Sequence, residues 1–276
     1  MKVAYQKNIP VRIAHSHSTS GKSEYIKNIV KFILRQFANR YPNERIACSE
    51  LAGRWLFGSE NDFCVINNGI DLDRFRFSQN DRLAIRRELN ISADGVILGN
   101  IGRMVPQKNQ AYLIDIFKEY HMINPNSYLV FLGKGPLQDN LKAYAIECGL
   151  SDRIIFLGYR KDSEKLYQAF DVFVLPSLYE GLPVVGVEAQ ASGLPCLFSN
   201  NVTNEVKIAE NVKFLSIDED PSIWAAEIDG LINMSREIDI SDFDEFDIEV
   251  QVEQLEEFYI KALKRSRGAF ICKPSL

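Results

Sequence analysis

The pattern of hydrophobic and polar positions is most regular between residues 96 and 215, where short apolar runs alternate with longer segments of mixed polarity. Apolar runs bounded by turn residues are typical of buried strands. Strands are predicted at Val96–Ile101, Tyr128–Leu132, Ile154–Leu157, Val172–Leu175, Cys196–Phe198 and Val212–Leu215. Helices are predicted between them at Ala111–Ile123, Leu137–Cys148, Ser163–Phe170, Val184–Ser192 and Glu205–Glu210. This alternation predicts a doubly wound parallel sheet with helices on both faces.

The pattern on either side of this region is less complete. Before it, a strand is predicted at VRIAHS, followed by a helix over Glu24–Arg40. A second short strand comes next, and then a helix whose expected N-cap is Ser49. This segment predicts an α/β domain whose beginning is absent. After it come two closing helices, Ser222–Ser235 and Glu249–Lys264. The predicted domains are therefore a partial one over residues 1–80, a complete one over 81–265, and a tail over 266–276.

Composition narrows the class of protein. Apolar residues make up 46% and charged residues 25% of the chain, which is ordinary for a soluble globular protein. The net charge of −5 argues against nucleic-acid binding, which requires a basic face. The five cysteines are scattered without metal-binding spacing, and no signal peptide or membrane-spanning run is present. These features predict a cytoplasmic protein with reduced thiols.

The loops that follow the first four regular strands are rich in glycine and charge. They are GRMVPQKN (102–109), GKGPL (133–137), GYRKD (158–162) and SLYEGLP (177–183). In an open parallel sheet these loops share the carboxyl edge, where ligands bind. The last one leads into a helix for which Pro183 suits the first position, and a helix N-terminus offers free N–H groups to a phosphate. The crevice is therefore expected to hold a phosphorylated ligand.

Most candidate side chains could serve either a binding site or only the local structure, and both alternatives remain open. Arg103 and Lys108 could hold a diphosphate or belong to a solvated loop. The lone Gly-x-Gly at 133–135 is explained by turn geometry, since neither a dinucleotide fingerprint nor a P-loop is present. His15 and His17 point to one face of a strand, but no third metal ligand is evident. Asp71-Leu-Asp73 follows an Asn-Gly turn in a helix-capping context, so no metal site is predicted.

Four segments occur in an order that resembles a known family. They are NNGID (67–71), GRMVPQKN, DVFVLPSLYEGLP, and the pair Glu180 and Glu188 in an E-x7-E pattern. From about Val11 to Lys264 the chain resembles retaining glycosyltransferases of the GT-B fold, family 4. The resemblance implies a complete, Rossmann-like donor-binding domain and a partial acceptor-side domain, because the family's glycine-rich loop would precede His17.

The resemblance also implies roles for individual residues. Arg103 and Lys108 would neutralise the diphosphate of a nucleotide sugar, Glu188 would bind the ribose hydroxyls, and Glu180 would lie near the donor sugar. His17 would contact the donor sugar or the reacting centre, with His15 as the second choice. No metal or further cofactor is expected. The remaining donor-binding positions are Tyr159 and Arg160 near the base, and the helix N-terminus at Gly181, Leu182, Pro183 and Val184.

The implied activity is that of a hexosyltransferase-type enzyme. It would transfer a sugar, with retention, from a UDP-sugar to a glycan or lipid-linked acceptor in capsule or exopolysaccharide synthesis, at the inner face of the cytoplasmic membrane. Two alternatives remain. One is a donor-binding module that needs a separate N-terminal chain. The other is a UDP-sugar epimerase of the GT-B type, which fits the Glu180–Glu188 spacing and NNGID less well.

Overall fold

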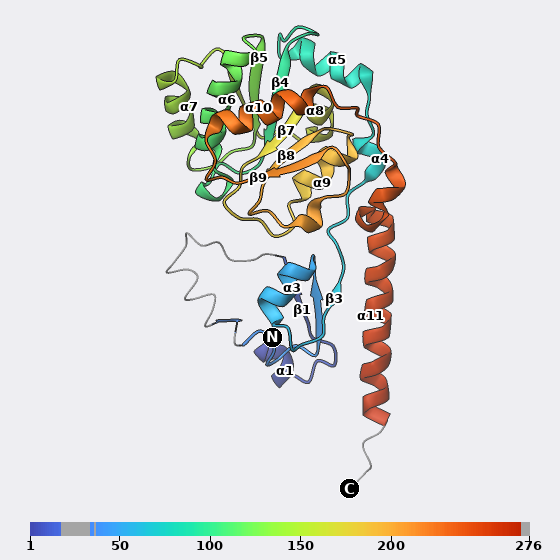
Figure 1. The fold of residues 1–276 in the computed structure, drawn as a ribbon. Helices are drawn as coiled ribbons and strands as arrows, with labels where there is room; N and C mark the ends of the chain where they lie inside the picture. Colours follow the sequence, from blue (N-terminus) through green and yellow to red (C-terminus); the bar gives the residue numbers. More distant parts are fainter. Residues whose placement is uncertain (18–33, 36, 272–276) are drawn as a thin grey trace. The chain divides into compact units, whose positions relative to one another are not determined.

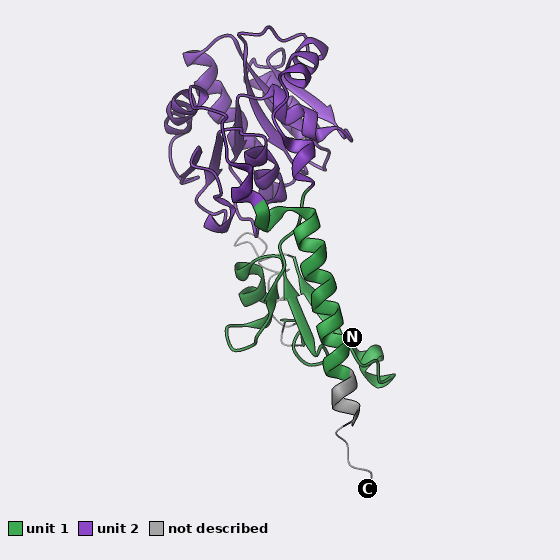
Figure 2. Cartoon of the chain, turned by 90° about the vertical axis from the view of Figure 1, so that its right-hand side faces the viewer, with its two compact units in different colours: residues 1–70, 244–276 green, residues 71–243 purple. Residues whose placement is uncertain are grey.

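The computed structural model describes residues 1–17, 34–35 and 37–271, and the chain divides into two compact units. Unit 1 comprises residues 1–70 and 244–276, and unit 2 comprises residues 71–243 (Figure 2). This division differs from the expected domains. Residues 71–80 belong to unit 2, because helices α4 (Leu72–Phe75) and α5 (Gln79–Glu88) both pack on helix α8 (Ser163–Ala169). The final helix belongs to unit 1.

Unit 1 is built on a small parallel sheet in the order β1-β2-β3, with strands Ile13–Ser16, Glu44–Ala47 and Cys64–Val65. Helix α1 (Lys2–Gln6) precedes the sheet, and helix α3 (Glu50–Phe57) follows β2. The side chain of Ser49 accepts a hydrogen bond from the amide of Ala52, which confirms the predicted N-cap. The predicted helix at Glu24–Arg40 lies largely outside the described residues.

Helix α11 (Ile248–Ile271) joins unit 1 through its two ends. Near its start, the amide of Ile70 donates to the carbonyl of Phe246, and the amide of Ile248 donates to the carbonyl of Ile70. Near its end, Arg265 forms an ion pair with Glu44 of β2 at 2.9 Å. The helix was predicted to end at Lys264. It continues through residues 265–271, so the first part of the expected tail is helical.

Unit 2 contains a six-stranded sheet in the order β6-β5-β4-β7-β8-β9, with every neighbouring pair parallel (Figure 1). The doubly wound sheet predicted from the sequence is confirmed. The strands are β4 (Val96–Ile101), β5 (Ser127–Leu132), β6 (Ile154–Gly158), β7 (Val172–Leu175), β8 (Cys196–Ser199) and β9 (Val212–Leu215).

Alternating strand residues bury against two different layers of helices. Val172 and Val174 of β7 face the core cluster formed with α6 (Gln110–Ile123), α7 (Gln138–Glu147) and α10 (Pro221–Ile232). Phe173 faces the opposite layer, where its ring lies 5.8 Å from that of Tyr167 in α8. Helices α4 (Leu72–Phe75), α5 and α9 (Val184–Ala191) complete that second layer. Period-two burial on both faces explains the continuous apolar runs in the sequence.

Two predicted helices differ in detail. The prediction of a helix at Glu205–Glu210 is wrong, because the chain forms only a 3₁₀ turn at Asn204–Val206. Thr203 caps this turn by accepting from the amide of Glu205, and the chain leaves the helical region at Lys207. Pro183 is the N-cap of α9 and not its first helical residue.

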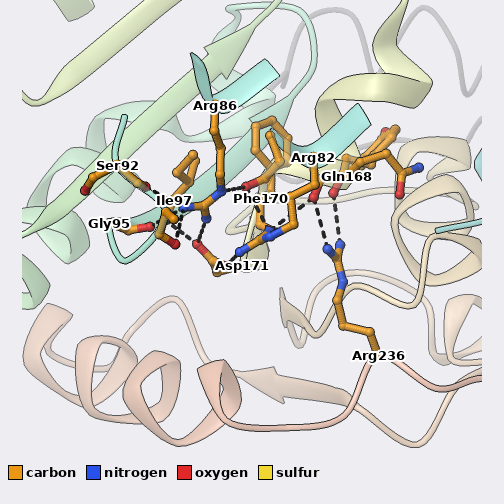
Figure 3. Close-up of polar contacts among 12 residues, drawn as sticks. Arg82, Arg86, Ser92, Gly95, Ile97, Gln168, Phe170, Asp171 and Arg236 are labelled. Atoms are coloured by element: carbon orange, nitrogen blue, oxygen red, sulfur yellow. Dashed lines mark hydrogen bonds and ion pairs between the residues drawn. The ribbon is translucent and has the colours of Figure 1, made fainter. Parts of the chain in front are cut away.

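The amino edge of the sheet carries a buried cluster of charge, drawn in Figure 3. Asp171, directly before β7, accepts hydrogen bonds from Arg82 and Arg86 of α5 at 2.5 Å each, and from the amide of Ile97 at 2.7 Å. The rest of the arginine N–H groups donate largely to backbone carbonyls at the end of α8 and before β4. This cluster ties α5 and α8 to the sheet.

Candidate functional site

The four loops predicted to share the carboxyl edge of the six-stranded sheet meet there through backbone hydrogen bonds. The amide of Met104 donates to the carbonyl of Lys134, and that of Gly133 donates to the carbonyl of Gly158 at 2.7 Å. The amide of Leu178 donates to the carbonyl of Gln107 at 2.8 Å. The loops after β4, β5, β6 and β7 therefore form one continuous surface.

The glycines of the Gly-x-Gly segment allow this close approach. Gly133 has φ of +134°, and a Cβ at this position would lie 2.0 Å from the carbonyl oxygen of Gly102. A Cβ at Gly135 would lie 2.2 Å from the carbonyl oxygen of Met104. Gly133 and Gly135 thus bring the loop after β5 against the loop that carries Arg103.

Glu180 and Lys108 form the centre of this edge. The Lys108 ammonium lies 2.6 Å from Oε1 of Glu180, and the two side chains are only 15% and 10% exposed. Ser177 donates its hydroxyl to the same oxygen at 2.9 Å. Gln107 donates to the carbonyl of Tyr179 at 3.0 Å and lies 3.3 Å from Oε2 of Glu180. The carboxylate is thus fixed in place from both loops.

Arg103 is the second cation of this edge. Its side chain is exposed, and among the described residues its guanidinium forms no ion pair. Its backbone is held, because its carbonyl accepts from the side chain of Gln110 at 3.1 Å. A fixed main chain that carries an unpaired guanidinium is suited to bind an anion.

Helix α9 begins beside Glu180. Pro183 is the N-cap, and its carbonyl accepts from the amides of Gly186 and Val187. The amides of Val184 and Val185 precede these and have no acceptor within the helix. Leu182 is buried and Gly181 is half-buried, so the loop that enters the helix is itself packed. A free helix N-terminus therefore lies beside the Lys108–Glu180 pair.

Glu188 lies one turn further along α9 and is half-buried. The hydroxyl of Tyr167 donates to its Oε2 at 2.7 Å. Burial raises the pKa of Glu188, while the Tyr167 hydrogen bond opposes this shift, and Glu164 and Arg74 also act on it. Arg74 forms an ion pair with Glu164 at 3.1 Å.

Tyr159 and Arg160 follow β6 and differ in environment. Tyr159 is 71% exposed. The guanidinium of Arg160 forms ion pairs with Glu88 and Asp162, and these hydrogen bonds raise the pKa of Arg160 above its ordinary value. Arg160 is therefore occupied by the protein's own carboxylates, whereas the Tyr159 ring is accessible.

His15 and His17 belong to unit 1, so they are described apart from the residues above. Both are exposed, and their ring centroids lie 3.9 Å apart. No group of three His, Cys, Asp or Glu side chains within the described residues is arranged to hold a metal ion. Asp73 forms an exposed ion pair with Arg76.

The neutral residues that hold the two glutamates were not predicted from the sequence. Gln107 and Ser177 lie in loops for which only charged residues were predicted to bind a ligand. Tyr167 lies in a helix for which no binding residue was predicted. For two of these residues the sequence does carry a signal, which is their closeness along the chain to a predicted charged residue. Ser177 stands three residues before Glu180, and Gln107 directly precedes Lys108.

The six-stranded parallel sheet, with cations, carboxylates and a helix N-terminus at its carboxyl edge, defines a Rossmann-like domain, a class in which ligands bind at that edge. Residues 81–240 match the family model described as glycosyl transferases group 1. The chain belongs to this family.

Curated relatives agree with this assignment. The chain is 37% identical over 227 residues to glycosyltransferase EpsF of Bacillus subtilis (strain 168), covering 80% of this chain and 59% of the relative. It is 35% identical over 190 residues to the Escherichia coli UDP-Gal:alpha-D-GlcNAc-diphosphoundecaprenol alpha-1,3-galactosyltransferase, covering 66% of this chain and 48% of that protein. The chain therefore spans about half to three fifths of the length of these relatives.

A solved structure of Anabaena HepE in complex with UDP shares the fold. Its TM-score is 0.79 at 22% sequence identity, and the match covers 94% of this chain and 74% of HepE. The GT-B type of fold is thereby confirmed. Within the part of the chain that the structure describes, no helix combines the length and hydropathy needed to cross a bilayer.

Proposed function

We propose that this chain carries the donor site of a glycosyltransferase that transfers a sugar from a UDP-sugar to a glycan or lipid-linked acceptor. The observation that carries the proposal is the Lys108–Glu180 pair, in which Lys108 shares its loop with the exposed Arg103 and Glu180 lies beside the N-terminus of α9. Two relatives support the ligand class: one is named for a UDP-galactose donor and a diphosphoundecaprenol acceptor, and HepE binds UDP.

The diphosphate would lie between the two cations and the helix. The Arg103 guanidinium is a planar, two-pronged donor, and the Lys108 ammonium is a compact point charge. The free amides of Val184 and Val185 add the positive end of the α9 dipole. As the glycosidic bond breaks, negative charge grows on the diphosphate, so these groups stabilise the leaving group and lower the barrier.

The two glutamates would bind different parts of the donor outside the diphosphate. Glu180 is held by Lys108 and Ser177 at the edge of the crevice, where it would lie near the donor sugar. Glu188, further along α9, would accept hydrogen bonds from the ribose hydroxyls. The exposed ring of Tyr159 would stack on the base.

The remaining parts of the proposal concern transfer itself. His17, with His15 as second choice, would contact the donor sugar or the reacting centre. Retention of configuration, membership of family 4 and a role in exopolysaccharide or capsule synthesis follow from the sequence resemblance. A lipid-linked acceptor would bring the protein to the cytoplasmic face of the membrane. No metal ion takes part in this scheme.

Calorimetric titration with UDP tests the donor site. We expect the wild-type chain to bind UDP, and Arg103→Ala to weaken binding by about 10- to 100-fold, as expected for a lost charge-assisted contact. Because Arg103 is exposed and unpaired among the described residues, the melting temperature of the variant should match that of the wild type.

Arg54→Ala is the matched control, since Arg54 is also exposed and lies in α3 of unit 1. It should leave UDP affinity unchanged. Absence of UDP binding by the wild type would refute the proposed function, and so would an unchanged affinity in Arg103→Ala.

A further inference from the structure

Tyr167 is a fully buried tyrosine whose hydroxyl reaches the candidate site. Its side chain is 0% exposed, and its hydroxyl lies 2.7 Å from Oε2 of Glu188 and 3.2 Å from the carbonyl of Val185. A phenol has one proton to donate, and the shorter contact with the charged acceptor takes it. Burial raises the pKa of Tyr167 well above its ordinary value, so the hydroxyl keeps this proton.

The ring of Tyr167 is fixed by aromatic packing. Phe75, Phe170 and Phe173 surround it, with ring centroids between 5.8 and 6.2 Å away. These neighbours come from α4, the end of α8, and β7. The hydroxyl therefore has little freedom to follow Glu188 if the carboxylate turns.

The backbone of Tyr167 is fixed as well, near the end of α8. Arg236 donates to the carbonyls of Tyr167 and Gln168 at 3.0 and 3.1 Å. Arg82 donates to the carbonyls of Gln168, Ala169 and Phe170 at 3.0 to 3.1 Å. Guanidinium groups thus take up the carbonyls that a helix C-terminus leaves without partners.

Glu188 is held by one of its two oxygens. Tyr167 occupies Oε2, and no side chain among the described residues donates a hydrogen bond to Oε1. Arg74 acts on the carboxylate electrostatically and pairs directly with Glu164. A carboxylate that binds two vicinal hydroxyls must be oriented, because each hydroxyl needs a lone pair in a fixed direction.

We propose that Tyr167 is the positioning residue that orients Glu188, by holding Oε2 so that Oε1 is presented to the ribose hydroxyls of the nucleotide. The inference rests on the proposed function, because it concerns recognition of the ribose within the same donor site. Tyr167 touches no ligand in this scheme. It sets the preference for ribose over a sugar that lacks the hydroxyls.

Tyr167→Phe removes the hydroxyl and keeps the ring. The measurement is the dissociation constant for UDP and for 2′,3′-dideoxy-UDP, and their ratio is the ribose discrimination. We expect the wild type to prefer UDP, and the variant to lose about 10-fold in UDP affinity with little change for the dideoxy compound. The ratio therefore falls about 10-fold.

Tyr144→Phe is the matched control. The Tyr144 hydroxyl of α7 also donates to a carboxylate, that of Asp115, but it lies outside the four loops and α9. This variant should keep the wild-type discrimination. A general loss of packing would lower affinity for both nucleotides alike and leave the ratio unchanged.

The pH profile supplies a second readout that separates orientation from packing. Loss of the Tyr167 hydrogen bond removes a group that favours ionised Glu188, so its pKa should rise further. The pH at which UDP affinity falls should then move upward in Tyr167→Phe, with Glu164 and Arg74 unchanged. Tyr144→Phe should show no such movement.

The outcomes are distinguishable. Retained discrimination and an unmoved pH profile in Tyr167→Phe would overturn the inference while UDP binding, and with it the proposed function, stands. Wild-type binding of UDP without discrimination against the dideoxy compound would overturn it too. If the wild type fails to bind UDP at all, the proposed function fails first and the inference falls with it.

Discussion

The two edges of the six-stranded sheet both carry basic side chains beside a carboxylate, yet they differ in how their donors are used. At the amino edge, Arg82 and Arg86 share Asp171, and their other N–H groups donate to backbone carbonyls. At the carboxyl edge, Lys108 pairs with Glu180, while Arg103 is exposed and unpaired among the described residues.

This difference distinguishes a structural cluster from the proposed binding site. The N–H groups of Arg82 and Arg86 are largely taken up by the chain, so few are left for a ligand. Arg103 has no internal acceptor among the described residues, and Lys108 has three N–H groups to share between Glu180 and an anion. The number of basic side chains around one carboxylate would by itself have favoured the amino edge as the binding site.

The largest expected effect comes from breaking the amino-edge cluster. Asp171→Ala leaves Arg82 and the fully buried Arg86 without their carboxylate, so we expect the free energy of unfolding to fall by about 3–5 kcal/mol. Urea titration followed by circular dichroism measures this. UDP affinity at a temperature where the variant is folded should remain that of the wild type.

Asp73→Ala is the matched control for charge. The Asp73 side chain is 83% exposed and pairs with Arg76, so its loss should cost less than about 1 kcal/mol. Equal effects of the two substitutions would show that the Asp171 cluster does not hold the fold. A loss of UDP affinity in folded Asp171→Ala would show that the two edges are coupled.

A smaller effect is expected at Glu188, where stability and binding should oppose each other. Burial raises the pKa of this carboxyl in the folded protein, so the folded state binds the proton more tightly than the unfolded state does. The carboxyl therefore favours folding most at pH values below its ordinary pKa of 4.5. This contribution is lost as the pH rises through the higher pKa of the folded state.

Glu188→Gln removes this titration. Its melting temperature should exceed that of the wild type by about 1–3 °C at pH 7–8, and the difference should shrink as the pH falls toward 4.5. Its UDP affinity should be lower. Scanning calorimetry across pH measures the difference, with the fully exposed Glu210→Gln as control. A gap in melting temperature that stays constant with pH would contradict the account.

Much of unit 2 could be predicted because its signals are local. Each apolar run between turn residues became a strand close to the expected bounds. In unit 1, Ser49 likewise caps its helix as its residue type suggests. The helix predicted at Glu205–Glu210 does not form, since the chain makes a 3₁₀ turn at Asn204–Val206 and is extended at Lys207. The strand order, with β4 between β5 and β7, depends on packing that no single segment encodes.

The charged residues of the candidate site were singled out from the sequence, and its neutral residues were missed. Lys108 and Glu180 were singled out separately, but their ion pair joins loops that lie far apart in the chain. The cluster around Arg82 and Arg86 was not predicted, because backbone carbonyls, which are most of their partners, leave no trace in a sequence. Tyr167 was missed for the same reason, since only the fold brings it to Glu188.

Hydrogen–deuterium exchange with and without saturating UDP tests most directly that the carboxyl edge is the ligand site. We expect slower exchange in peptides covering residues 102–110 and 177–188, and unchanged exchange in peptides covering residues 79–95, at the amino edge. Slowed exchange confined to residues 79–95, or none in either carboxyl-edge segment when UDP is bound, would contradict the account.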